Sequence, residues 1–137
     1  MTIGNNNTPG ASQTVLYVED NPLNALVVRS ILKARRPEIT LIIADTGAAA
    51  LEQLRKKAPD FLLIDIILPD TNGVDLLKSI RANAAWRHIP AAATSATMPP
   101  DEIKSLLDAG FGQFLLKPIN TAQLLQVLTA AGLYIAA

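Results

Sequence analysis

Five residues of the 137-residue chain carry side chains that could act together chemically, and each follows a short apolar run. They are two neighbouring carboxylates, a single carboxylate, a hydroxyl and an ammonium: Glu19, Asp20, Asp65, Ser95 and Lys117. Carboxylates with no histidine or cysteine beside them favour Mg²⁺, and a lysine with a hydroxyl can hold an anion. Gathered in one place, these groups would form a site for phosphoryl transfer.

Asp65 is the candidate nucleophile of such a site. It stands alone in FLLIDIILPD, with apolar residues at 61–64 and 66–68. The chain has no Gly-rich phosphate loop, which argues against a bound nucleotide as the phosphoryl donor. A carboxylate can itself attack a phosphoryl group and form an aspartyl phosphate. A lone Asp after a strand is more often a helix cap, so this interpretation depends on the other four residues.

The elements that must position these residues are short apolar runs that alternate with amphipathic stretches. The expected strands are 14–18, 39–44, 60–65, 90–94 and 112–116, and the expected helices are about 22–35, 47–57, 73–84, 99–109 and 120–131. Such alternation implies right-handed crossovers and a parallel sheet covered by helices on both faces. Ligands bind such sheets at the carboxyl ends of the strands, where the five candidate residues fall.

Composition limits the remaining possibilities. Half of the residues are hydrophobic, which is typical of a globular domain, and the 12 basic and 12 acidic residues give no field that favours nucleic acid or an anionic membrane. The chain has no cysteine, which excludes disulfides and thiolate metal sites. No secretory signal or membrane span is recognisable, so we expect a cytoplasmic protein. The single histidine, His88, is expected in a surface loop.

From about residue 14 to 131 the chain resembles the receiver domain of bacterial two-component response regulators, including the chemotaxis regulator and the receivers of hybrid sensor kinases. The matching motifs are Glu19-Asp20, Asp65-Ile66-Ile67-Leu68-Pro69, Gly73, Ser95-Ala96 and Lys117-Pro118. The resemblance implies an α/β fold of three layers, doubly wound and flavodoxin-like, with five helices and five parallel strands in the order 2-1-3-4-5. It divides the chain into a disordered tail (1–13), a receiver domain (14–132) and an apolar C-terminal extension (133–137).

The resemblance also implies the chemistry. Asp65 would accept a phosphoryl group from a phosphohistidine on a sensor histidine kinase or a histidine phosphotransfer protein. Mg²⁺ would be bound by Asp20, by Asp65 and by the backbone carbonyl of Ile67, with Glu19 acting through water. Family members often have a polar residue at the position of Ile67, so we expect its side chain to hinder the hydrolytic water and prolong the phosphorylated state.

The remaining site residues would convert phosphorylation into a change of surface. By the resemblance, Lys117 pairs with one phosphate oxygen, and Ser95 moves to hydrogen-bond another. Phe114 stands at the position of the switch aromatic, which turns inward when the hydroxyl moves and alters the surface of the fourth helix, fifth strand and fifth helix. The family's Lys-Pro bond is typically cis, and we predict the same for Lys117-Pro118.

The implied protein is a signalling domain and not an enzyme, apart from catalysing its own phosphorylation and dephosphorylation. Its downstream target stays open, as do the choice between a stand-alone regulator and a part of a hybrid kinase, and the formation of a homodimer through the apolar extension. One alternative is a degenerate receiver that binds partners without phosphorylation. Another is a small Mg²⁺-dependent phosphatase of the haloacid-dehalogenase type, which needs a second Asp where this chain has Ile67.

Overall fold

The computed structural model describes residues 13–97 and 100–133, and these form the expected alternation of strands and helices. The strands are β1 (Gln13–Val18), β2 (Ile39–Ala44), β3 (Phe61–Asp65), β4 (Ala91–Ser95) and β5 (Gln113–Leu116). The helices are α1 (Pro22–Arg35), α2 (Gly47–Lys56), α3 (Gly73–Arg81), α4 (Pro100–Ala109) and α5 (Thr121–Ala130), with a 3₁₀ turn η1 (Ala84–Trp86) after α3. Except for Gln13 and Leu133, the expected tail and extension lie outside the described residues.

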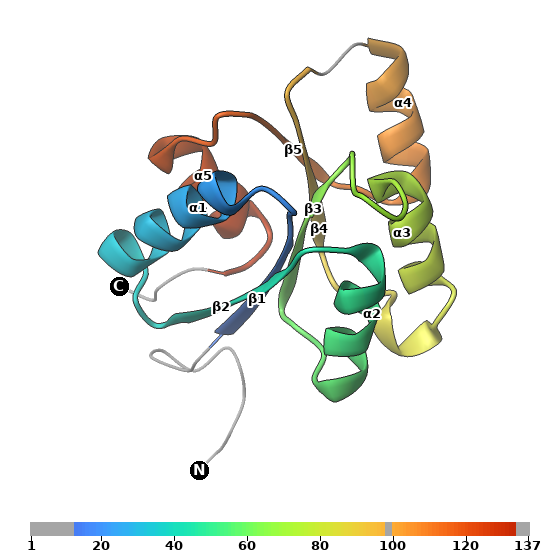
Figure 1. Ribbon diagram of the computed structural model, residues 1–137, viewed down its shortest axis with the longest axis horizontal. Helices are drawn as coiled ribbons and strands as arrows, with labels where there is room; N and C mark the ends of the chain where they lie inside the picture. Colours follow the sequence, from blue (N-terminus) through green and yellow to red (C-terminus); the bar gives the residue numbers. More distant parts are fainter. Residues whose placement is uncertain (1–12, 98–99, 134–137) are drawn as a thin grey trace.

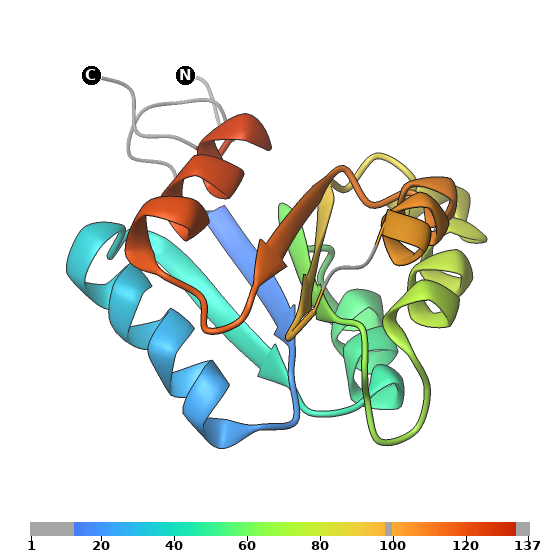
Figure 2. The ribbon, with the colours of Figure 1, turned by 90° about the horizontal axis from the view of Figure 1, so that it is seen from above.

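The strands form one parallel sheet in the order β2-β1-β3-β4-β5, which confirms the predicted topology. Helices α1 and α5 cover one face, and α2, α3 and α4 cover the other (Figures 1 and 2). This three-layer arrangement brings the carboxyl ends of β1, β3, β4 and β5 to one edge. Among the described residues, no helix is both long enough and apolar enough to cross a membrane.

The core consists of two layers, one on each side of the sheet. On the α2–α4 side, Leu16, Leu62 and Ile64 pack with helix residues such as Leu77 and Leu106. On the α1–α5 side, Val15, Tyr17, Phe61 and Leu63 pack with Val28 and Leu124. The central strands are therefore apolar at successive positions, because both of their faces are covered. Each fully buried large side chain stabilises the fold by about 1.5–3 kcal/mol.

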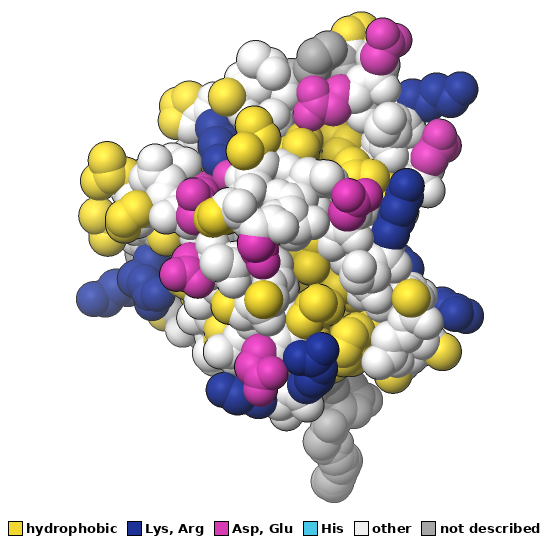
Figure 3. Space-filling model, turned by 45° about the vertical axis from the view of Figure 1, so that its right-hand side comes forward, with side chains coloured by type: hydrophobic (Ala, Val, Ile, Leu, Met, Phe, Trp, Pro, Cys, Tyr) yellow, Lys and Arg dark blue, Asp and Glu magenta, His cyan; other side chains and the backbone are white. Residues whose placement is uncertain are grey.

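Charged side chains lie mostly outside this core. On the face shown in Figure 3, Lys and Arg side chains are interspersed with Asp and Glu side chains, and apolar side chains lie between them. This distribution agrees with the equal numbers of acidic and basic residues in the sequence. The buried charges that remain are few among the described residues, and two of them, Glu19 and Asp65, belong to the candidate site.

Candidate functional site

Three carboxylates meet where β1 and β3 end. Glu19 directly follows β1 and Asp65 is the last residue of β3, and these two strands are neighbours in the parallel sheet. One carboxylate oxygen from each of Glu19, Asp20 and Asp65 lies within 4.8 Å of the others. Glu19 and Asp65 are buried, whereas Asp20 is exposed. The predicted acidic cluster is therefore formed, with two carboxylates inside the protein and the third facing solvent.

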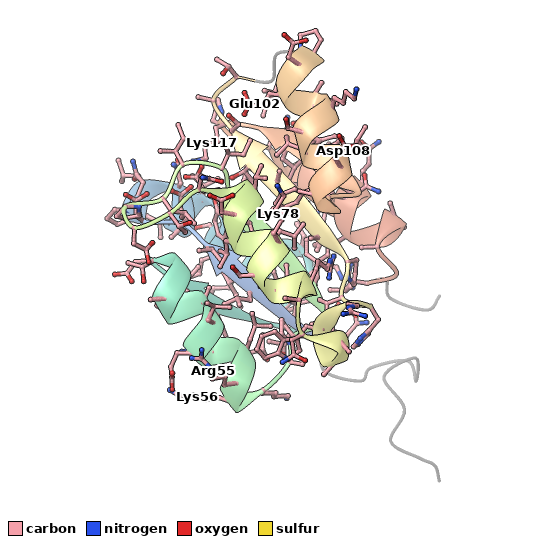
Figure 4. All side chains as sticks on the ribbon, turned by 90° about the vertical axis from the view of Figure 1, so that its right-hand side faces the viewer. Arg55, Lys56, Lys78, Glu102, Asp108 and Lys117 are labelled. Atoms are coloured by element: carbon pink, nitrogen blue, oxygen red, sulfur yellow. The ribbon has the colours of Figure 1, made fainter. Side chains whose placement is uncertain are left out.

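Lys117 supplies the positive charge at this cluster. Its Nζ lies 2.7 Å from Asp65 Oδ2 and 2.8 Å from Glu19 Oε1. Figure 4 shows Lys117 at the end of the sheet, beside the loop that leads into α3. The Lys117-Pro118 peptide bond that follows is cis, which confirms the prediction. One ammonium thus bridges two buried carboxylates that would otherwise repel each other.

The protonation equilibria reflect this sharing. Burial raises the pKa of Asp65 above its usual value, and the hydrogen bonds from Lys117 and Ile67 only partly oppose that effect. Burial is also the largest single effect on Glu19, but the interactions with Lys117, Asp65 and the Asn21 backbone N–H together outweigh it, and the pKa of Glu19 is lowered. Burial would lower the pKa of Lys117, yet its hydrogen bonds to the two carboxylates raise it. Lys117 therefore stays an ammonium in the folded protein.

The hydroxyl and the aromatic ring predicted for the switch lie on β4 and β5. Ser95 is buried at the end of β4, and its Oγ accepts a hydrogen bond of 3.3 Å from the Thr97 backbone N–H. The Lys117 backbone N–H donates to the Ser95 carbonyl over 2.8 Å, which joins the ends of β4 and β5. Phe114 is partly buried and packs against the core on the α2–α4 side.

The loop from β3 to α3 wraps closely around Asp65. The Ile67 backbone N–H donates to Asp65 Oδ1 over 3.1 Å, while the Ile67 side chain is 76% exposed. The Gly73 N–H donates to the Ile66 carbonyl over 2.7 Å. A Cβ at Gly73 would lie 2.8 Å from the Asp65 carbonyl oxygen and 2.9 Å from Ile66 Cα. Only glycine allows this loop to close so tightly behind Asp65.

Helix α1 begins at the site through local sequence signals. Asn21 caps the helix, since its Oδ1 accepts hydrogen bonds from the backbone N–H groups of Leu23 (2.8 Å) and Asn24 (3.4 Å). Pro22 occupies the first turn, where its missing N–H costs nothing. Because Asn21 makes the cap, the neighbouring Asp20 carboxylate is left available for a ligand.

Sequence reasoning missed two residues at this edge of the sheet. Tyr17 is fully buried, and its hydroxyl donates to Glu19 Oε1 over 3.0 Å. A buried phenol in a largely apolar strand needs a hydrogen-bond partner, and this signal could have found the contact. The two oxygens of Asp70 accept hydrogen bonds from the backbone N–H groups of Gly47 (2.8 Å) and Ala48 (3.0 Å) at the start of α2. No local pattern predicts that second contact, which depends on the packing of α2 beside the loop.

The donor set fits Mg²⁺. It offers carboxylate oxygens and, in the same loop, backbone carbonyls, with no histidine or cysteine among the described ligand groups. Mg²⁺ keeps several of its waters and is bound by one or two carboxylates. The exposed position of Asp20 leaves room for those waters. His88 is exposed in the loop between η1 and β4, as expected, and takes no part in the cluster.

Comparison with known proteins gives a consistent result. A family model described as the response regulator receiver domain matches residues 15–129. The sensor protein GacS of Pseudomonas syringae pv. syringae is 35% identical over 117 residues, which are 83% of this chain but only 13% of GacS. The polar-differentiation response regulator DivK of Brucella ovis is 29% identical over 117 residues, which cover 85% of this chain and 94% of DivK. The chain thus spans a small part of one relative and nearly all of the other.

Solved structures show the same fold. The chain is similar to the receiver domain of sensor histidine kinase PA1611 from Pseudomonas aeruginosa PAO1, with a TM-score of 0.78 and 28% identity over 89% of this chain and 99% of that one. That structure holds a magnesium ion coordinated in its active site cleft. The chemotaxis response regulator CheY4 of Vibrio cholerae gives a TM-score of 0.81 with 22% identity, over 88% of this chain and 99% of that one.

Proposed function

Because the chain belongs to the response regulator receiver domain family of two-component signalling, we propose that Asp65 accepts a phosphoryl group from a phosphohistidine on a partner protein. The observation that carries this proposal is the environment of the Asp65 carboxylate. Lys117 Nζ lies 2.7 Å from Oδ2, the Ile67 N–H lies 3.1 Å from Oδ1, and oxygens of the acidic pair lie within 4.8 Å. Each Asp65 oxygen accepts a hydrogen bond, and the acidic pair that could share a metal with Asp65 lies beside it.

In the transfer, an Asp65 carboxylate oxygen forms a bond to phosphorus while the bond from phosphorus to the histidine nitrogen breaks. The electron pair of the broken bond stays on the imidazole of the donor. Lys117 then turns its ammonium from the carboxylates toward a phosphoryl oxygen, and the Ser95 hydroxyl donates to another. The protein supplies orientation and charge stabilisation and takes up no proton in this step.

The residues that would hold Mg²⁺ are Asp20, Asp65 and the backbone carbonyl of Ile67, with Glu19 acting through a bound water. When bound, Mg²⁺ supplies positive charge that offsets both the carboxylates and the phosphoryl oxygens. The protein places two of these carboxylates in a buried position, where their mutual repulsion is strong and a cation is favoured. These residues therefore favour a bound divalent cation beside Asp65.

The partner that donates the phosphoryl group is proposed to be a sensor histidine kinase or a histidine phosphotransfer protein. Its histidine has to reach Asp65 at the end of β3, so its surface has to cover the elements around that edge. Helix α1 starts there and exposes three apolar side chains, Leu23 (71% exposed), Leu26 (56%) and Val27 (38%). Exposed apolar side chains gathered on one helix are typical of a protein contact, and this face is adjacent to the site.

The output is proposed to be a change of the α4–β5–α5 surface. Ser95 and Phe114 lie on adjacent strands, so movement of the hydroxyl toward a phosphoryl group would free space for the ring to turn. Two apolar side chains of this surface, Leu107 and Leu116, are 54% and 48% exposed. A target protein that covers them in one state of the ring would read the phosphorylation.

The test is incubation with Mg²⁺ and phosphoramidate, followed by the intact mass of the wild type and of Asp65→Asn. We expect the wild type to gain one phosphoryl group and Asp65→Asn to gain none. Asp70→Asn, which changes a carboxylate of the same loop outside the proposed metal ligands, should still gain it. A wild type that gains no mass, or an Asp65→Asn variant that does, would contradict the proposal.

A further inference from the structure

Tyr17 contacts the site from inside the core, and no step of the proposed transfer uses it. Its ring is fully buried on the α1–α5 side of the sheet, and its hydroxyl donates to Glu19 Oε1 over 3.0 Å. The same oxygen lies 2.8 Å from Lys117 Nζ. Glu19 Oε1 therefore has two donors: a neutral hydroxyl fixed by the core, and an ammonium at the end of a flexible side chain.

The two donors to Glu19 Oε1 differ because the proposed transfer requires Lys117 to move, whereas Tyr17 stays in place. Lys117 has to leave a carboxylate if its ammonium is to pair with the phosphoryl group. Glu19 is 2% exposed, so water cannot easily replace the lost hydrogen bond at Oε1. Among the residues that the structure describes, the other oxygen, Oε2, accepts a hydrogen bond from the Asn21 backbone N–H alone, over 3.2 Å. Without Tyr17, the buried carboxylate would hold Lys117 as its main donor and resist its departure.

The position of Tyr17 is set by the sheet rather than by the site. Its strand is paired on both sides, with Ile43 of β2 and with Leu63 of β3 as its direct neighbours. The phenol therefore cannot follow a movement of Lys117. Among the described residues, Tyr17 has the one side-chain hydroxyl that hydrogen-bonds to Glu19.

We propose that Tyr17 is a positioning residue that keeps the buried Glu19 carboxylate hydrogen-bonded and in place while Lys117 moves to the phosphoryl group on Asp65. This inference rests on the proposed function. It assigns Tyr17 a role through Glu19 and none in direct contact with the phosphoryl group. The hydrogen bond from Tyr17 should lower the barrier to the departure of Lys117 from Glu19. The protein should therefore be phosphorylated faster at saturating Mg²⁺ than a variant that lacks this hydroxyl.

The variant Tyr17→Phe removes the hydroxyl and keeps the ring, so the core is preserved. With Mg²⁺ at saturation and phosphoramidate as the donor, we expect the variant to be phosphorylated about tenfold more slowly, the size of one hydrogen bond to a charged group. Combined with Glu19→Gln, the same change should have less than about a twofold further effect, because Tyr17 acts through Glu19.

A second measurement needs neither metal nor phosphodonor. In urea unfolding of the metal-free protein, Tyr17→Phe should change the unfolding equilibrium constant more when Glu19 is present than in the background of Glu19→Gln. Equal rates for the wild type and Tyr17→Phe would overturn the inference and leave the proposed function intact. Equal slowing in both backgrounds would also overturn it, because a packing role predicts that result. A wild type that is never phosphorylated would overturn the proposed function and this inference together.

Discussion

Lys117 and Asp65 are separated by 52 residues in the sequence and by 2.7 Å between Nζ and Oδ2 in the structure. The same ammonium contacts Glu19, so one side chain from the end of β5 neutralises carboxylates from the ends of β1 and β3. A cation that belongs to the protein thus occupies the neighbourhood that a metal cation would share. We therefore expect Lys117 and a bound Mg²⁺ to compete for the same carboxylates.

Lys117→Met should destabilise the metal-free protein and increase the benefit of Mg²⁺. Removing the cation leaves two buried carboxylates unpaired, which we expect to lower the free energy of unfolding by about 1–3 kcal/mol, since the Lys117 side chain is partly exposed. Mg²⁺ at tenfold its dissociation constant stabilises a protein by about 1.4 kcal/mol, and the variant should reach this gain at a lower Mg²⁺ concentration than the wild type. Urea unfolding across a Mg²⁺ series measures both effects.

The matched control is Arg55→Met, because Arg55 forms an exposed ion pair with Glu52 in which both side chains are about 60% exposed. Its loss should change the free energy of unfolding by less than about 1 kcal/mol, with no effect on the Mg²⁺ response. If Lys117→Met needed more Mg²⁺ than the wild type for the same gain, the ammonium and the metal would not be competitors.

Asp65→Asn should stabilise the metal-free protein at neutral pH. Burial raises the pKa of Asp65, so the folded state binds its proton more readily than the unfolded state does. The stability that this proton contributes is present below the unfolded pKa of about 3.9 and is lost as the pH rises through the folded pKa. The variant should therefore exceed the wild type in free energy of unfolding near pH 7, and the difference should shrink toward about pH 3. Urea unfolding in EDTA across this range is the measurement.

Asp70→Asn serves as a control of opposite sign. The hydrogen bonds from Gly47 and Ala48 lower the pKa of Asp70, so its stabilisation is present above the unfolded pKa and is lost as the pH falls. Replacing Asp70 should thus destabilise the protein at neutral pH and matter less in acid. The same sign for both variants would show that the environments of the two carboxylates do not differ in the way the contacts indicate.

Ile67→Asn should shorten the life of the phosphorylated protein. The Ile67 side chain is 76% exposed beside Asp65, where an apolar group leaves the hydrolytic water without a hydrogen-bond partner. The loss of the phosphoryl group, followed by intact mass after removal of the donor, should be several-fold faster in the variant. Leu107→Asn, at an exposed apolar position on α4, should decay as the wild type does. Equal or slower decay of Ile67→Asn would refute the expectation.

Gly73→Ala should damage both stability and the site. The added methyl group would meet the Asp65 carbonyl oxygen at 2.8 Å and Ile66 Cα at 2.9 Å, which are backbone atoms that cannot move aside separately. We expect a loss of about 1–3 kcal/mol in the free energy of unfolding and a weaker Mg²⁺ response, because the strain falls on the residue that holds the carboxylate. Gly112→Ala is the matched control, since its Cβ would have no atom within 4 Å. Equal stability of the two variants would contradict the account of the loop.

Leu26→Glu should impair phosphorylation by a protein donor and not by a small one. Leu26 is 56% exposed on α1, so the change should leave the fold and the rate with phosphoramidate unaffected. With a phosphorylated histidine phosphotransfer domain as the donor, we expect a rate about tenfold lower, as for the loss of one important interface residue. Leu107→Glu alters a similarly exposed leucine on α4 and should behave as the wild type with both donors. Equal slowing by both variants would contradict the proposal that the phosphodonor protein contacts α1.

Most of the architecture was predictable because both faces of the sheet are covered. Continuous apolar runs such as 61–64 can only be central strands in this context, and each predicted helix lies within three residues of its observed bounds. The strand of alanines at 91–93 was the weakest case, since alanine disfavours strands. It forms β4 because it pairs with β3 on one side and β5 on the other, and its three alanines are buried between the two helix layers.

The candidate site was predictable to the extent that its residues follow strands. Glu19, Asp65 and Lys117 each end or follow a strand, and the parallel topology brings such positions together. The hydrogen bonds of Tyr17 and Asp70 were not predicted, for different reasons. The first follows from a buried phenol that needs a partner, whereas the second joins residues of two separate loops and depends on how α2 packs against the sheet.

The contact of Asp70 with the first turn of α2 sets a limit on loop length. The two ends of the segment 66–72 are joined by the hydrogen bond from the Gly73 N–H to the Ile66 carbonyl, and Asp70, within the segment, reaches Gly47 and Ala48. An insertion of one residue between Leu68 and Asp70 would leave the Ile67 carbonyl where it is but would withdraw the carboxylate from the helix. The insertion should therefore loosen the first turn of α2, which is not among the elements proposed to contact the phosphoryl group.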